Sequence, residues 1–183
     1  MKLKEIIHYE KKLYFSTRKE YIKERLFHSN KYKIFKWQSF LRKEEYYAEK
    51  SKANKLFLLC LIFYRRKKNK LGRILGFDIP GGVFEPGLRI WHASPIVVNP
   101  FAKVGKNATI VGNLCIGNNK GEKISAEIGD NCTFGWGCAV IGNVKISAHC
   151  VVGAGAIVVK DVCEDGAVMA GVPAENIARK IKQ

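Results

Sequence analysis

The spacing of apolar residues divides the chain into two parts. In the first part, apolar side chains such as Ile22, Leu26 and Phe27 recur at helical spacing, and no Gly or Pro occurs before residue 70. The segment KKNKLGRILGFDIPGG then introduces the Gly and Pro residues that end regular elements. This change predicts an α-helical region over residues 1–73.

From Val98 onward the apolar positions repeat every six residues, with one interruption at 118–127. Each hexapeptide predicts one short strand and one tight turn, and three strands close a coil that stacks on the next. A helix is excluded because a period of six does not match about 3.6 residues per turn. The pattern predicts a mainly β protein, with a parallel β-helix over residues 74–174 and a C-terminal tail or short helix over 175–183. The apolar anchors of the repeat are Val98, Val104, Ile110, Ile116, Ile128, Phe134, Val140, Ile146, Val152 and Val158.

A second inward position lies four residues after each anchor and carries small or medium side chains. Cys132, Cys138 and Cys150 occupy this position, so their spacing follows the repeat and not a disulfide or metal pattern. Free Cys behaves as a small hydrophobic residue, so these cysteines are predicted to fill the core. No His or Asp follows the same spacing, and no metal site is predicted.

The net charge of +16 is concentrated in the helical region. Residues 1–73 hold 22 Lys and Arg against 7 Glu, whereas the rest of the chain holds 10 against 9 acidic residues. Such a surface can be a solvated helical face, or it can bind a polyanion such as nucleic acid or anionic lipid. No nucleic-acid-binding motif accompanies the charge, so no nucleic-acid partner is predicted.

The longest apolar run, Leu56–Tyr64, lies between basic residues of this region. It is too short to span a bilayer, which requires about 20 apolar residues. We interpret it as a helix packed on the first coil or at a subunit interface, and a peripheral contact with an anionic membrane is the alternative. The start of the chain has no continuous apolar core typical of a signal peptide. The cytoplasm is therefore the predicted compartment, with attachment to the inner face of the membrane as the alternative.

Three stretches carry a resemblance to a known family. They are GLRIWHASPIVVN at 87–99, the repeats from Val98 to Val158, and VGAGAIVVKDVCEDGAVMAGVPAENI at 152–177. Together they resemble the bacterial hexapeptide-repeat acyltransferases, in particular the serine acetyltransferase branch and its relatives in capsule and O-antigen gene clusters. The resemblance implies a left-handed parallel β-helix, a homotrimer, and acetyl-CoA as co-substrate in a groove between neighbouring subunits, without a metal.

The resemblance also implies roles for individual residues. His92 matches the general base, and Asp78 lies near the position of the carboxylate that assists it. Acetyl transfer from a thioester to a hydroxyl requires such a base, together with donors for the developing oxyanion. The residues that match or replace coenzyme contacts are Trp136, Ala154, Gly155, Ala156, Lys160, Ala170, Gly171 and Pro173.

Two departures from serine acetyltransferases affect the predicted acceptor. Trp91 stands where those enzymes have an Asp, and the stretch KGEKISAEIGDN lacks their acceptor-binding His and Arg. A Trp beside the base suggests an apolar ring face, so we predict a saccharide acceptor, a sugar hydroxyl of a surface polysaccharide or its precursor. The alternatives are a serine O-acetyltransferase of cysteine biosynthesis and a non-catalytic trimeric scaffold. The predicted substrate contacts are Trp91, Asn99, Asn118 and Asn119.

Overall fold

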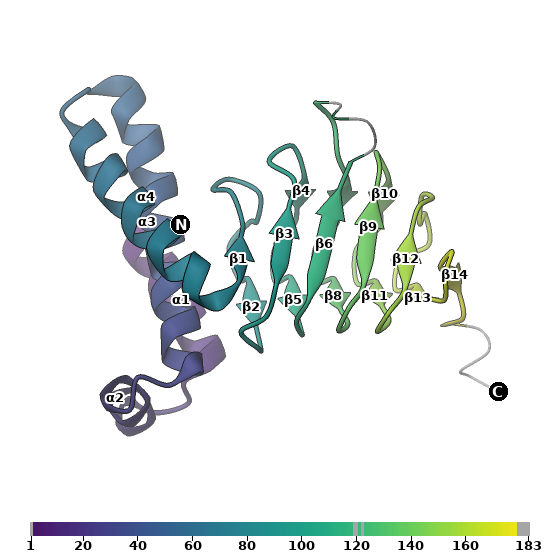
Figure 1. Ribbon diagram of the computed structural model, residues 1–183, viewed down its shortest axis with the longest axis horizontal. Helices are drawn as coiled ribbons and strands as arrows, with labels where there is room; N and C mark the ends of the chain where they lie inside the picture. Colours follow the sequence, from purple (N-terminus) through teal and green to yellow (C-terminus); the bar gives the residue numbers. More distant parts are fainter. Residues whose placement is uncertain (1, 119–120, 122, 179–183) are drawn as a thin grey trace.

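A computed structural model describes residues 2–118, 121 and 123–178. Four helices form a layer at one end of a β-helix, whose coils follow one another along the long axis of the molecule (Figure 1). The helices are α1 (Leu3–Tyr14), α2 (Arg18–Leu26), α3 (Asn30–Ala53) and α4 (Phe57–Leu75). Thr17 and Ser29 cap α2 and α3 by accepting a backbone N–H of the first turn. Gly76, at φ +82°, ends α4 in the left-handed conformation that Gly adopts without strain.

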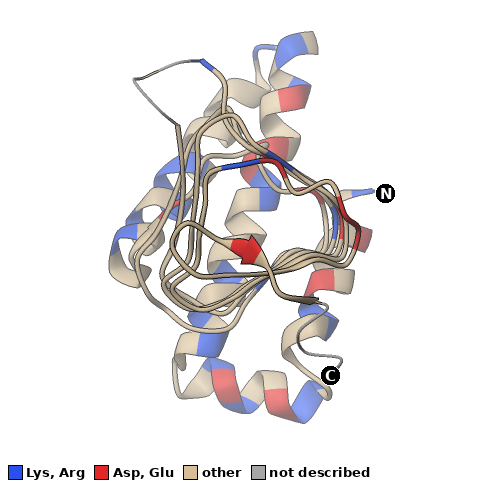
Figure 2. Ribbon diagram, turned by 90° about the vertical axis from the view of Figure 1, so that its right-hand side faces the viewer, with Lys and Arg blue, Asp and Glu red and all other residues tan. Residues whose placement is uncertain are grey.

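The strands after Gly76 are short and build three sheets. Strands β1, β3, β6, β9 and β12 form one sheet, β4, β7 and β10 a second, and β2, β5, β8, β11 and β13 a third, all in parallel register. Seen along the axis, the coils superpose as a three-sided prism (Figure 2). The strand bounds are β1 Phe77–Asp78, β2 Arg89–Ile90, β3 Ile96–Val98, β4 Lys103–Val104, β5 Thr109–Ile110, β6 Leu114–Gly117, β7 Glu127–Ile128, β8 Thr133–Phe134, β9 Ala139–Ile141, β10 Lys145–Ile146, β11 Val151–Val152, β12 Ile157–Val158, β13 Val168–Ala170 and β14 Glu175–Asn176.

The core of the prism confirms the six-residue pattern. Every predicted anchor is at most 5% exposed, and wherever the position four residues later is described, it is buried as well. Each fully buried Val or Ile contributes about 1.5–3 kcal/mol relative to an exposed one. Burial raises the pKa of the Cys138 thiol to about 12 and that of Cys132 to about 11, as expected for cysteines that fill a core.

The predicted C-terminal tail or short helix, 175–183, begins with a short strand. Glu175–Asn176 forms β14, which pairs antiparallel with β13 and closes the last coil, and Ala178 is helical. Residues 179–183 lie outside the described residues, so the helix stays a prediction.

The run Leu56–Tyr64 does not pack on the first coil, and its place at a subunit interface stays a prediction. It forms the N-terminal half of α4, but its only buried large side chain is Leu61, and Leu59 is 71% exposed. α4 meets the first coil through its C-terminal half, where Lys68 donates to the Ile79 carbonyl and Leu75 is buried, so the run lies beside α3 and away from the coil (Figure 1). No helix of the described chain is long and apolar enough to cross a bilayer.

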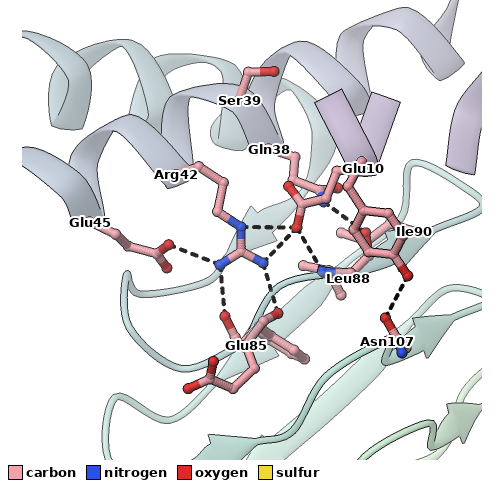
Figure 3. A network of polar contacts seen from close by, with 12 residues as sticks. Glu10, Gln38, Ser39, Arg42, Glu45, Glu85, Leu88, Ile90 and Asn107 are labelled. Carbon is pink, nitrogen blue, oxygen red and sulfur yellow. Dashed lines mark hydrogen bonds and ion pairs between the residues drawn. The ribbon is translucent and has the colours of Figure 1, made fainter. Parts of the chain in front are cut away.

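The helical layer is joined to the first coil by a buried polar network (Figure 3). The Arg42 guanidinium binds Glu10 at 2.8 Å and Glu45 at 2.9 Å, and donates to the backbone carbonyls of Phe84 and Glu85. Burial opposes the charge of Arg42, but the two carboxylates raise its pKa, so the guanidinium stays ionised.

A second buried pair extends this junction. The Tyr14 hydroxyl donates to Gln38 at 2.8 Å and accepts the Ile90 N–H at 2.9 Å, and the Gln38 amide donates to the Leu88 carbonyl. Helices α1 and α3 therefore hold the backbone around β2, the strand that leads directly to the predicted base.

Candidate active site

The turns that follow the strands of the third sheet stack at one corner of the prism. Ile90 pairs with Ile110, Ile110 with Phe134, Phe134 with Val152, and Val152 with Met169, so the next turns lie one above another. We call this edge the histidine corner, defined by residues 91–95, 111–113, 135–138, 153–156 and 171–174. It brings His92, Trp136, Ala154, Gly155, Gly171 and Pro173 into one column along successive coils.

His92 and Trp136 contact each other across an intervening coil. Their ring centroids lie 6.1 Å apart at an interplanar angle of 64°. Gly112 lies between them, and a Cβ at this position would come within 2.5 Å of the Trp136 ring and 2.8 Å of the Ser94 hydroxyl. The glycine therefore provides the space through which Trp136 reaches the base.

Ser94 fixes the turn that carries His92. Its hydroxyl accepts the Asn113 N–H at 2.8 Å and lies 3.4 Å from the His92 carbonyl, to which it donates. Asn113 itself has φ +48°, a conformation that Asn tolerates better than most residues. Within the described part of the chain, the imidazole nitrogens of His92 form no hydrogen bond, so both remain available to a substrate or an orienting group.

Asp78 occupies a different surface from His92. It lies in β1, paired with Val97 of β3, and borders a pocket that also contains Glu44 and Lys68. Among the residues that the structure describes, no hydrogen bond or ion pair joins Asp78 to His92. Its assisting role is therefore not supported by a contact within one protomer.

Other predicted contacts lie at a second corner, formed by the turns after β3, β6 and β12. Lys160, Asn99 and Asn118 occupy these turns, because Val98 pairs with Ile116 and Val158 with Val140 in the same sheet. The Asn99 side chain accepts the Phe101 N–H at 2.9 Å and so stabilises its own turn. Asn119 lies outside the described residues.

Two predicted coenzyme contacts are less exposed than the rest. Ala156 is fully buried, so its side chain faces the core and cannot touch a coenzyme. Ala170 belongs to β13 and is half-buried. The exposed positions of the column are Trp136, Ala154, Gly155, Gly171 and Pro173.

Arg89 is a neighbour of Trp91 that the sequence analysis did not consider. Its guanidinium carbon lies 5.2 Å from the centroid of the Trp91 ring, and Trp91 remains 52% exposed. Strand alternation could have predicted this neighbour, because positions 89 and 91 flank the buried Ile90 and therefore share the outward face.

Comparisons with known proteins find sequence similarity to serine acetyltransferases. The chain is 38% identical over 111 residues to a serine acetyltransferase of Mycobacterium tuberculosis, which covers 58% of the chain and 48% of that protein. The similarity is to serine acetyltransferases. The chain spans about half the length of this curated relative, and no protein-family model matches it.

Solved structures give the same result for the fold. A serine acetyltransferase of Neisseria gonorrhoeae superposes with a TM-score of 0.68 at 23% identity, over 96% of this chain and 65% of that one. The same bacterium's enzyme in complex with serine gives a TM-score of 0.58 at 25% identity, over 79% and 55% of the two chains. The likeness supports the left-handed β-helix that the sequence resemblance implied, and it matches the helical region only loosely.

The comparisons overturn the predicted sugar acceptor. These relatives and neighbours are serine acetyltransferases, which favours the alternative acceptor, serine, and gives no support to the resemblance to capsule or O-antigen enzymes. The expectation of a sugar relied on an apolar ring face of Trp91, and the Arg89 guanidinium gives this ring a cationic neighbour.

Proposed function

We propose that the protein is an acetyl-CoA-dependent serine O-acetyltransferase with His92 as its general base. The observation that carries this proposal is the histidine corner, which stacks an unengaged imidazole, a half-exposed Trp136 and the small turns of the last coils in one column. The similarity to serine acetyltransferases supports the choice of acceptor and of co-substrate.

The reaction needs no covalent enzyme intermediate in this arrangement. The serine hydroxyl gives its proton to the His92 imidazole while its oxygen attacks the thioester carbonyl. The tetrahedral oxyanion then collapses, the carbon–sulfur bond breaks, and the imidazolium returns the proton to the departing CoA thiolate. The products are O-acetylserine and CoA, and His92 is neutral again.

The exposed small residues of the last coils suit a flexible coenzyme arm. Ala154, Gly155 and Gly171 leave a shallow surface beside Trp136, on which an extended chain could lie without displacing side chains. Trp136 offers this arm an apolar edge close to His92. Because the Ala156 side chain faces the core, the surface open to the coenzyme includes fewer residues than the sequence predicted.

A homotrimer would reconcile the two corners that carry predicted site residues. Lys160, Asn99 and Asn118 lie at a different edge from His92 within one protomer. If the coenzyme lies between neighbouring β-helices, as the resemblance implies, the second corner of one subunit faces the histidine corner of the next. Lys160 would then meet a phosphate of CoA from the neighbouring subunit. Sedimentation equilibrium measures the trimer directly.

The test of the proposal is CoA release from acetyl-CoA in the presence of L-serine. We expect serine-dependent release by the wild type and a loss of about 10²–10⁴-fold in His92→Ala. His8→Ala is the matched control, because His8 is exposed on α1 and far in the chain from this corner. Equal activity in wild type and His92→Ala would remove His92 from the mechanism.

The membrane contact and the cytoplasmic location stay predictions. Leu59 and Phe63 are exposed on α4 next to Arg66 and Lys67, and this surface is the one that a membrane would contact. Co-sedimentation with vesicles of anionic and of zwitterionic lipid measures whether it does.

A further inference from the structure

Arg89 and Trp91 form a pair on the outer face of the first coil. Ile90 between them is 1% exposed, whereas Trp91 is 52% exposed, so the two outward side chains lie side by side on one surface. The Trp91 backbone is fixed by its N–H bond to the Ile110 carbonyl at 2.9 Å, and the Ile90 N–H is held by Tyr14. The pair therefore lies on a rigid strand directly before His92.

The charge of Arg89 is not compensated by the protein. No ion pair of Arg89 with a carboxylate occurs among the described residues, although Arg42 and Arg65 each pair with a Glu. The turns of the histidine corner contain no Asp or Glu at all. A guanidinium stacked on an aromatic ring keeps its N–H edge free, and that edge matches a carboxylate in a bidentate geometry.

The proposed acceptor brings a carboxylate that requires such a partner. Serine presents its hydroxyl to the base and its carboxylate a few ångströms away, and the stretch 120–131 lacks the acceptor-binding His and Arg. Arg89 precedes His92 by only three residues, so the reach of an extended chain places their Cα atoms at most about 11 Å apart. An extended arginine side chain and the acceptor itself can bridge this distance.

We propose that Arg89, held on the Trp91 ring, forms the carboxylate-binding subsite for the acceptor, a role that rests on the proposed serine acetylation. Trp91 is a positioning residue in this arrangement, because it acts through Arg89 and keeps the guanidinium on the side of His92.

The experiment compares L-serine with L-serinamide, which has the same hydroxyl but no carboxylate charge. In Arg89→Gln we expect kcat/KM for serine to fall about 10- to 100-fold, mainly through KM, because a hydrogen bond to a charged group contributes about 1.5–3 kcal/mol. The value for serinamide should change by less than about threefold. Arg89→Lys should recover part of the loss on serine, and Arg25→Gln, an exposed arginine on α2, is the control.

Two results would overturn the subsite. An equal loss on serine and serinamide would mean that Arg89 acts on the fold of the turn, and an unchanged value for serine would mean that the carboxylate binds elsewhere. Calorimetric binding of serine and serinamide separates this proposal from the proposed function. If the protein binds serine better than serinamide in an Arg89-dependent way but does not turn serine over, the subsite is retained and serine acetylation is rejected. If the protein acetylates serine without that binding preference, serine acetylation is retained and the subsite is rejected.

Discussion

The corner that carries Asn107, Asn131 and His149 is closed by a series of hydrogen bonds between side chains, whereas the corner that carries His92 and Trp136 has no such series among the described residues. Both use the left-handed conformation at successive coils, with φ +59° at Asn107 and Asn131 and +68° at Gly155. The Asn107 amide donates to Asn131 at 3.0 Å, the Asn131 amide to His149 Nε2 at 3.1 Å, and His149 Nδ1 lies 3.1 Å from Asp165. We call this edge the asparagine corner.

The difference shows that one turn geometry can stabilise the stack or leave it open to a ligand. The Tyr9 hydroxyl begins the series by donating to Asn107 at 2.8 Å, so the asparagine corner connects α1 to the last coil. At the histidine corner the equivalent positions are mostly Gly and Ala, whose side chains make no such series. Substitutions at the first edge should therefore affect stability, and substitutions at the second should affect catalysis.

The largest expected effect that separates the two corners is on the rate. His92→Ala should lower kcat by about 10²–10⁴-fold while leaving the thermal midpoint of unfolding within about one degree, because the exposed ring stabilises nothing but its contact with Trp136. His149→Ala should lower the thermal midpoint of unfolding and leave kcat unchanged. A large drop in thermal midpoint for His92→Ala would show that the histidine corner also stabilises the fold.

Gly112→Ala should affect both properties. Its Cβ would overlap the Trp136 ring and the Ser94 hydroxyl, so we expect a loss of about 1–3 kcal/mol of unfolding free energy and reduced turnover as Trp136 moves away from His92. Gly117→Ala is the control, because its Cβ would come no closer than 3.4 Å to the Ile141 side chain. Removal of the indole in Gly112→Ala/Trp136→Gly should recover part of the stability, because the overlap with the Ser94 hydroxyl remains. If the double variant is no more stable than Gly112→Ala, the overlap with the Trp136 ring is not the cause of the lost stability.

Asn131→Ala should break the asparagine corner in its middle. It removes two side-chain hydrogen bonds and the residue that tolerates φ +59°, so we expect a loss of about 1–2 kcal/mol in urea-induced unfolding. The kcat with serine should remain unchanged. A parallel fall in kcat would mean that the two corners are coupled.

Lys160→Ala should have the smallest effect. An exposed cation that meets a phosphate contributes about 0.2–1 kcal/mol, so we expect KM for acetyl-CoA to rise by up to about fivefold and the effect to diminish in high salt. Lys145→Ala, on the three-stranded sheet, is the control. No change in KM at low salt would remove Lys160 from the coenzyme site.

The β-helix could be predicted from the sequence because each anchor obeys a strict six-residue rule, from Val98 to Val158. His92 could be predicted because its motif is local. The Arg42 network could not, since a charged residue in a helix normally indicates a solvated face, whereas this one is 3% exposed and binds backbone carbonyls of the first coil. The position of Arg89 beside Trp91 could have been inferred from strand alternation, which puts positions 89 and 91 on the same outward face.

The measurement that tests the central claim most directly is the acetyl transfer itself. Purified protein is incubated with acetyl-CoA and L-serine, with CoA release followed by a thiol reagent and the product identified by mass spectrometry. Our proposal predicts equimolar CoA and O-acetylserine with wild type and almost none with His92→Ala. Release of CoA without O-acetylserine, or no release with intact binding of acetyl-CoA, would contradict it.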